Sequence, residues 1–198
     1  MTNHLRIAGT VGLIAPFFSF ACILLSIASW SPFNWVNNAL SDLGVQSGIT
    51  RIIFNNGLVF SGLLLIIFAT GISPLIDKLI LGKVGSAVFI LACVALIGIG
   101  IFNENLSPAH YIFSVAFFML FPISMLVLVG AFWIEERHKL SMFTLALSLA
   151  AAATWVLQFT VHFVSDVAVP EFVSGLLGAI WTIELSYLML EKSKNDSS

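Results

Sequence analysis

The stretch VGSAVFILACVALIGIGIF, residues Val84–Phe102, contains no charged side chain. A helix needs about 20 mostly apolar residues to cross the hydrocarbon core of a bilayer, and this stretch has that length. Backbone N–H and C=O groups cannot stay unpaired in lipid, so a run of this kind must be helical unless the chain closes a barrel. Barrel strands are short and alternate in polarity, whereas this run is long and uniformly apolar. The stretch therefore predicts a membrane-spanning helix.

Five further stretches of the same kind flank it. These five are Ile7–Trp30, Ile52–Pro74, Tyr111–Ile134, Leu140–Val164 and Val169–Leu190, which with Val84–Phe102 makes six. Most connections between them are short, so consecutive helices should pack side by side and antiparallel. The sequence predicts an all-α integral membrane protein, with one six-helix transmembrane domain over 1–191 and a polar tail over 192–198.

The composition agrees with a chain immersed in lipid. Of the 198 residues, 59% are hydrophobic and only 9% are charged, whereas soluble domains carry about 25% charged residues. The net charge is −2 and no block of like charge occurs, which gives nucleic-acid binding no electrostatic basis. Cys22 and Cys93 fall inside apolar runs, where a cysteine is typically a small buried hydrophobe.

The orientation follows from the positive-inside rule. With the N-terminus inside, seven Lys and Arg residues fall on the cytoplasmic side and one, Arg51, falls outside. The seven are Arg6, Lys78, Lys83, Arg137, Lys139, Lys192 and Lys194. We therefore expect a multi-pass protein of the plasma membrane with both termini in the cytoplasm and the lipid bilayer as its surroundings.

Labelling from outside the cell tests this orientation. A cysteine placed at position 104 should react with a membrane-impermeant maleimide, and one at position 137 should be protected, because the two positions lie on opposite sides in the expected topology. Reaction at 137 without reaction at 104 would invert the orientation.

The long outer connection, Ser31–Arg51, has helical signals. Ser31 suits a helix cap, Pro32 the first helical position and Gly44 a C-terminal stop. Phe33, Val36, Leu40 and Leu43 follow helical spacing, with asparagines on the other side. We therefore expect a short amphipathic surface helix over Pro32–Asp42, packed on the outer end of the bundle with Leu40 and Leu43 inward.

Polar residues gather at the outer ends of the predicted helices. Polar groups are costly in lipid, so their clustering is the clearest functional signal in the chain. Candidate catalytic groups are Asp42, Glu104, His110 and His162, which four separate segments deliver to the same depth. Candidate binding groups are Ser41, Asn55, Gln158 and Asp166. We expect these side chains to converge on one outward-facing polar cavity.

The fifth predicted helix carries the sharpest polar pattern. Thr154, Gln158, His162 and Asp166 recur every four residues, which places them on one face of the helix. Such a stripe must face the bundle interior or a wet cavity. Two interpretations stay open: a functional cavity, or a layer of hydrogen bonds that joins helix ends.

A metal site is a further hypothesis for the same residues. His110, His162 and Asp42 are of the ligand types that zinc prefers, and a three-ligand site leaves room for an activated water. No His-x-x-x-His or HExxH motif accompanies them. The cofactor is otherwise unknown, and a capping or pH-sensing role for His110 is the alternative.

Short motifs of this chain resemble an uncharacterised family of membrane proteins, the domain of unknown function numbered 998. They are Ser41-Asp42-Leu43-Gly44, then Phe54-Asn55-Asn56-Gly57-Leu58, and Gly100-Ile101-Phe102-Asn103-Glu104-Asn105 followed by His110. Asn103 stands where proline is usual. The resemblance implies a six-helix fold and singles out Ser41, Asp42, Asn55, Glu104 and His110, without implying a reaction.

A more distant likeness is to membrane hydrolases similar to alkaline ceramidases and adiponectin receptors. These use a serine, an aspartate and three histidines around zinc, for which Ser41, Asp42, His110 and His162 would be the counterparts. The chain lacks a seventh helix and a third outer histidine.

Three classes of function remain open from the sequence. One is a membrane-embedded hydrolase that acts on a lipid or lipid-linked substrate, with the carboxylates and histidines moving protons. Another is a small transporter or channel, in which the polar stripe continues through Glu184. The third is a non-catalytic scaffold or binding protein. The first is favoured because the polar residues stop at one leaflet.

Overall fold

The computed structural model describes residues 2–76 and 80–196. Among these residues, six helices are long and apolar enough to cross a membrane. They are α1 (Thr2–Ala28), α2 (Ile49–Ala69), α4 (Ile80–Ile101), α5 (Ala109–Ile134), α6 (His138–Val161) and α7 (Ala168–Asn195). Three short helices complete the order: η1 (Ser41–Val45), α3 (Ile72–Leu75) and η2 (Glu104–Leu106). The predicted all-α six-helix bundle is confirmed.

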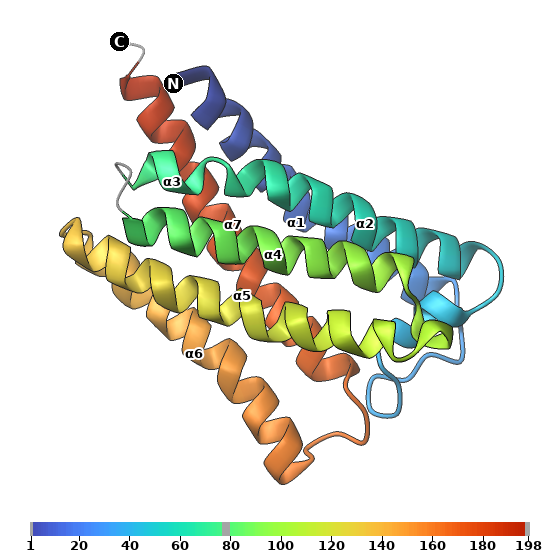
Figure 1. The fold of residues 1–198 in the computed structure, drawn as a ribbon. Helices are drawn as coiled ribbons and strands as arrows, with labels where there is room; N and C mark the ends of the chain where they lie inside the picture. Colours follow the sequence, from blue (N-terminus) through green and yellow to red (C-terminus); the bar gives the residue numbers. More distant parts are fainter. Residues whose placement is uncertain (1, 77–79, 197–198) are drawn as a thin grey trace.

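The six long helices form a ring in chain order. Each packs on the next one along the chain, and α7 returns to pack on α1. Both termini lie at one end of the bundle, while η1 and η2 lie at the other (Figure 1). We call the end that carries Ser41, Glu104 and His110 the polar end, and the opposite one the terminal end. Toward the polar end α6 diverges from α5 (Figure 1).

Glycines set how closely neighbouring helices approach. A Cβ added at Gly57 of α2 would lie 2.5 Å from the Cβ of Cys22 on α1, and one at Gly100 of α4 would lie 2.6 Å from the backbone oxygen of Asn55 on α2. Small residues at such crossings are the usual device in membranes, where helices associate by packing rather than by the hydrophobic effect.

An aromatic layer fills the middle of the bundle. Trp181 of α7 is fully buried, with ring centroids 5.5 Å from Phe89, 6.3 Å from Phe68 and 6.5 Å from Phe121. Its indole Nε1 donates to the hydroxyl of Thr144 on α6 at 3.1 Å, so the ring buries no unpaired donor.

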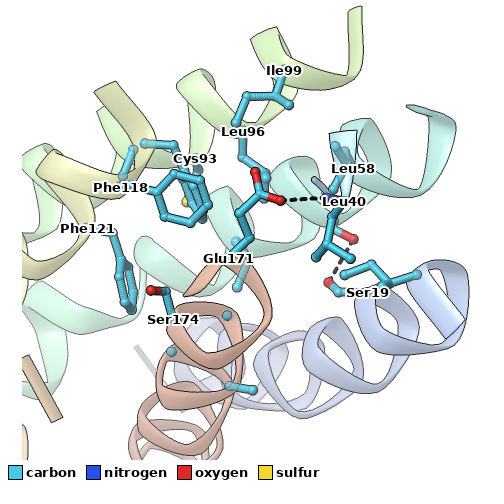
Figure 2. Close-up of a pocket in the computed structure, with 18 of the residues that line it drawn as sticks. Ser19, Leu40, Leu58, Cys93, Leu96, Ile99, Phe118, Phe121, Glu171 and Ser174 are labelled. Carbon is cyan, nitrogen blue, oxygen red and sulfur yellow. Dashed lines mark hydrogen bonds between the residues drawn. The ribbon is translucent and has the colours of Figure 1, made fainter. Parts of the chain in front are cut away.

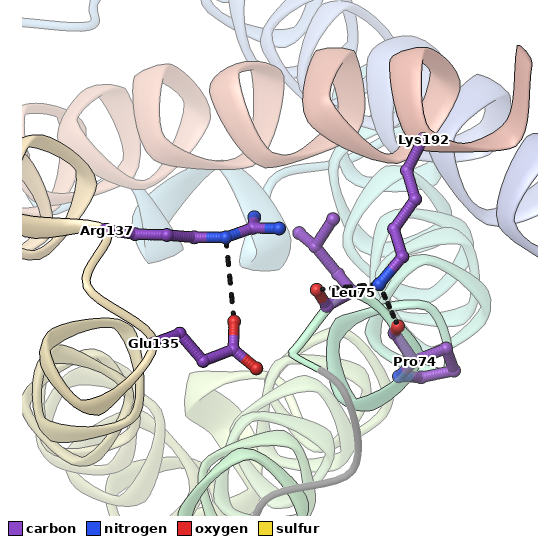
Figure 3. Close-up of polar contacts among 5 residues, drawn as sticks. All are labelled: Pro74, Leu75, Glu135, Arg137 and Lys192. Carbon is purple, nitrogen blue, oxygen red and sulfur yellow. Dashed lines mark hydrogen bonds and ion pairs between the residues drawn. The ribbon is translucent and has the colours of Figure 1, made fainter. Parts of the chain in front are cut away.

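The terminal end differs from the expected boundaries at α7. α7 continues to Asn195, so residues 192–195 of the predicted tail are helical. Lys192 explains why, because its Nζ donates to the backbone oxygens of Pro74 at 3.2 Å and Leu75 at 3.4 Å, which satisfies the end of α3 (Figure 3). Nearby, Arg137 pairs with Glu135 at 3.5 Å. The described residues do not include Lys78, which is one of the seven Lys and Arg residues expected on the cytoplasmic side. They also do not include Met1 or the last two residues of the tail.

The predicted surface helix over Pro32–Asp42 is wrong. Residues 31–40 form turns, and only Ser41–Val45 is helical, as a 3₁₀ turn. Asparagine side chains compete with the helix here, since Asn34 Oδ1 accepts from the N–H of Val36 and of Asn37 at 2.9 and 3.2 Å. Gly44 lies inside η1, and the positive φ falls at Gly48. The expected inward side chains are confirmed, because Leu40 and Leu43 are buried.

Candidate functional site

The polar end brings Ser41, Asp42 and Glu104 together. The Ser41 hydroxyl on η1 donates to Glu104 Oε1 on η2 at 2.6 Å. Asp42 Oδ2 accepts from the side-chain amide of Asn38 at 2.7 Å and from the Ala39 N–H at 3.1 Å. The Ser41–Glu104 bond joins the loop after α1 to the loop after α4, and the Asp42 bonds hold the first of these loops in its turn.

His110 joins this cluster from the first turn of α5. Its Nδ1 donates to the backbone oxygen of Phe102 at 2.7 Å, because a carbonyl can only accept. In the neutral ring Nε2 is then an acceptor, and it lies 3.4 Å from the Ser114 hydroxyl. The ring is buried and lies near enough to Glu104 for their charges to interact.

Glu104 is held in an environment that resists ionisation. Burial raises the pKa of this carboxyl above its ordinary value of 4.5, and the neighbouring Asp42 raises it further through its charge and a shared hydrogen bond. The Ser41 hydroxyl and His110 act in the opposite direction. Two acids that share one proton are a recurring arrangement for general acid–base chemistry.

His162 does not join the cluster, and the predicted convergence fails for this residue. α6 ends at Val161, and His162 turns out of the helix in the left-handed conformation, with φ 53°. Its side chain is exposed. The four-residue stripe therefore stops at Gln158, since helical spacing has no meaning beyond the end of the helix.

Gln158 and Asp166 have structural roles in the α6–α7 connection. Buried Gln158 donates from Nε2 to the backbone oxygens of Val164 at 3.0 Å and Asp166 at 3.2 Å. Asp166 Oδ1 accepts from the N–H of Val167 at 2.8 Å, next to the start of α7. Thr154 bonds back to the oxygen of Ala150 in its own helix. This part of the stripe matches the hydrogen-bond-layer interpretation.

Asn55 supports η1 from below. Its side-chain amide donates to the backbone oxygen of Gly44 at 3.0 Å, while its Oδ1 is buried without a partner. A Cβ on residue 44 would lie 2.6 Å from that Oδ1, so only glycine allows the contact. The residue positions the loop that carries Ser41 and Asp42.

The arrangement does not fit the zinc hypothesis. Within the described residues, no three His, Cys, Asp or Glu side chains are grouped so as to hold a metal ion. His162 is turned away from His110 and Asp42 by the end of α6. The described residues therefore do not form the zinc site that the likeness to ceramidase-like hydrolases implies.

A mostly apolar cavity of about 140 Å³ lies beneath the cluster. Residues of α1, α2, α4, α5 and α7 line it, and α6 contributes none. At its polar end are Leu40, Ser41 and Glu171, where the Leu40 N–H donates to Glu171 Oε2 at 2.6 Å (Figure 2). Its deeper wall includes Phe89, Phe121 and Thr182.

Glu171 and Ser174 are site residues that the sequence prediction missed. Both line the cavity from the first turns of α7 (Figure 2). A signal exists in the sequence: Glu171, Ser174, Gly175 and Gly178 follow the i, i+3, i+4, i+7 spacing of one helix face. This small and polar face on an otherwise apolar helix marks the side that meets the cavity.

The fold and the cluster define a polytopic membrane protein with a polar site above an intramembrane cavity. A family model described as "Protein of unknown function (DUF998)" matches residues 13–187. The chain therefore belongs to this family, as its motifs indicate. No curated protein and no solved structure matches the chain.

Glu104 gives the polar end a pH dependence of defined sign. Its pKa is raised in the folded state, so the unfolded chain ionises first as pH rises above 4.5, and folding stability falls until the raised pKa is passed. Glu104→Gln cannot ionise and keeps an acceptor for Ser41. We expect its unfolding temperature to fall less than that of the wild type between pH 4 and 8.

The matched control is Glu136→Gln, an exposed glutamate at the terminal end. This variant should keep the wild-type pH profile. If the unfolding temperature of Glu104→Gln changed with pH in the same way as that of the wild type, the pKa of Glu104 would not be raised in the folded state.

Proposed function

We propose that this protein binds a lipid with a single hydrocarbon chain, which enters the cavity while the headgroup meets the cluster at the polar end. The observation that carries the proposal is the cavity itself, apolar along its length and polar where it meets Leu40, Ser41 and Glu171. A membrane lipid has the same division of chemistry, with an apolar chain and a polar head.

The dimensions favour one chain. The lining runs along α7 from Glu171 to Thr182, which is roughly 16 Å at 1.5 Å per residue. The volume of about 140 Å³ compares with the cavity of about 150 Å³ that holds a benzene molecule. A narrow space of this kind accepts a short length of one chain and excludes two side by side.

The orientation belongs to the same proposal. The Lys and Arg count favours cytoplasmic termini and an outward-facing polar end, in the plasma membrane. The headgroup would then be that of an outer-leaflet lipid.

Transport is less well supported. A transport path would have to cross the aromatic layer of Phe68, Phe89, Phe121 and Trp181. Glu184, which the transport hypothesis would use, is exposed and lines a separate open groove at the terminal end with Arg137 and Lys139. Its position favours a carboxylate directed to water over a relay within the core.

Filling the cavity tests the binding proposal. A Cβ on Gly175 would have Phe20 Cζ as its nearest neighbour at 3.7 Å, so Gly175→Leu places a side chain in the cavity without a backbone clash. We expect binding of octan-1-ol to protein in nanodiscs, measured by calorimetry against empty nanodiscs, to weaken roughly tenfold, or about 1.4 kcal/mol.

Gly130→Leu is the control, since Gly130 lies on α5 outside the cavity and has Leu81 Cδ1 at 3.4 Å. It should bind like the wild type. Wild-type protein that binds no more octan-1-ol than empty nanodiscs would refute the proposed function.

Hydrolysis of the bound lipid is a second candidate, favoured by the 2.6 Å bond between Ser41 and Glu104. Ser41 lines the cavity at its polar end, where the bond between chain and headgroup would lie. Glu104 is placed to accept the serine proton, and its raised pKa makes its carboxylate a stronger base. The Ser41 oxygen would attack the ester carbonyl, and the headgroup alcohol would leave with the proton held by Glu104. Water would then cleave the acyl–serine ester, which restores Ser41 and releases a carboxylic acid.

A simple ester tests this candidate. The protein in nanodiscs should cleave 4-nitrophenyl octanoate. Ser41→Ala or Glu104→Gln should lower the rate by about 100-fold, while both variants still bind octan-1-ol. Thr154→Ala, which loses only a bond within α6, should leave the rate unchanged. Equal rates for all four proteins would reject hydrolysis at this site and leave lipid binding standing.

A further inference from the structure

Ser174 has a buried hydroxyl that forms no hydrogen bond within the described residues. It is 4% exposed, lines the cavity, and its Oγ has no hydrogen-bond partner among the described residues. Several serines in the described spans bond back to a carbonyl one turn earlier, as Ser86 and Ser186 do at 2.7 Å. A buried polar group without a partner costs free energy, so Ser174 marks a place where a ligand would supply one.

Glu171 lies one turn above Ser174 on the same face of α7. One of its carboxylate oxygens, Oε2, accepts from the Leu40 N–H. The carboxyl group lies between Leu40 and the ring of Phe118 at the polar end of the cavity (Figure 2). A headgroup at this depth would therefore meet two acceptors, the carboxylate of Glu171 and the hydroxyl oxygen of Ser174.

The charge at this end is unbalanced. Glu171 lies close enough to Glu104, Asp166 and Asp42 for their charges to interact. Within the described residues, no Lys or Arg forms an ion pair with any of these four acids, since the ion pair present joins Arg137 to Glu135 at the other end. Carboxyl groups gathered at the edge of lipid need a cation or protons to offset their repulsion.

Selectivity at this cavity must come from the headgroup. Lipid tails are as apolar as the cavity wall, so the hydrocarbon chain alone does not distinguish one single-chain lipid from another. Polar contacts in a medium of low dielectric constant are stronger than in water. The groups at Glu171 and Ser174 therefore decide which single-chain lipid is retained.

We propose that the cavity selects a single-chain lipid with a primary ammonium headgroup, whose N–H groups donate to Glu171 and Ser174. This rests on the proposed function and names its ligand class. A primary ammonium supplies both what the acids lack, a positive charge, and what Ser174 lacks, a hydrogen-bond donor.

Four octyl compounds separate the contributions of chain, charge and donors. They are octylamine, octan-1-ol, octanoate and octyltrimethylammonium, titrated against the protein in nanodiscs at neutral pH with empty nanodiscs as reference. We expect octylamine to bind at least tenfold more tightly than each of the others. The trimethyl compound carries the charge without N–H donors, so equal binding of it and octylamine would overturn the proposal.

Two variants locate the contact. Glu171→Gln keeps an oxygen for the Leu40 N–H, so it should keep octan-1-ol binding while the preference for the amine falls to about that of the alcohol. Ser174→Ala should lower octylamine affinity several-fold, whereas Ser148→Ala, whose hydroxyl bonds to the Pro122 oxygen outside the cavity, should not.

The outcomes distinguish the two levels of the proposal. Similar affinities for amine, alcohol and carboxylate would overturn the ammonium inference and leave chain binding intact. No binding of any octyl compound above empty nanodiscs would overturn both. An amine preference that persists in Glu171→Gln would refute the assignment of the headgroup to α7.

Discussion

Lipid offers no hydrogen-bond partner, and this constraint shapes almost every polar contact in the bundle. Ser26 bonds to the Cys22 oxygen and Ser141 to the Val129 oxygen, both within 3 Å. Polar residues in the spans are therefore mostly part of the packing, and their number says little about function. The informative polar groups are those that the chain leaves without a partner. Ser174 is such a group, and it faces the cavity.

The spans were predictable because the conditions for crossing a membrane are local. Length and apolarity suffice, so Val84–Phe102 could be assigned without knowing its neighbours, and α4 covers Ile80–Ile101. The loop after α1 was not predictable in the same way. Its apolar residues follow helical spacing, yet the side chain of Asn34 captures the backbone N–H groups that a helix would need. Burial of Leu40 and Leu43 was still correct, because it depends on where the apolar residues go and not on the helix.

The candidate site was predictable where its residues lie at helix ends of equal depth. Glu104 and His110 come together because a short connection joins α4 to α5, and Ser41 reaches them from the longer loop after α1. The prediction for His162 was wrong because it assumed that α6 continues to this residue, whereas α6 ends one residue earlier. Glu171 does not stand out in the sequence, because an acid in a first helical turn has an ordinary explanation in the helix dipole. Only the three-dimensional contact with the Leu40 N–H shows that it closes the cavity.

The ring of helices also has a consequence for how the protein is made. The cavity wall includes α1, which leaves the ribosome before the other five long helices, and α7, which leaves after them. Chains are synthesised from the N-terminus, so α1 and α2 are in place long before Glu171 exists. During that interval the Leu40 N–H has no carboxylate to receive it, and the face of α1 that will meet α7 is open to lipid or to the insertion machinery. Among the six long helices, α7 is therefore the one that completes the cavity. A chain interrupted before α7 would carry Ser41, Glu104 and His110 but would lack the wall of the cavity that Glu171 and Ser174 form.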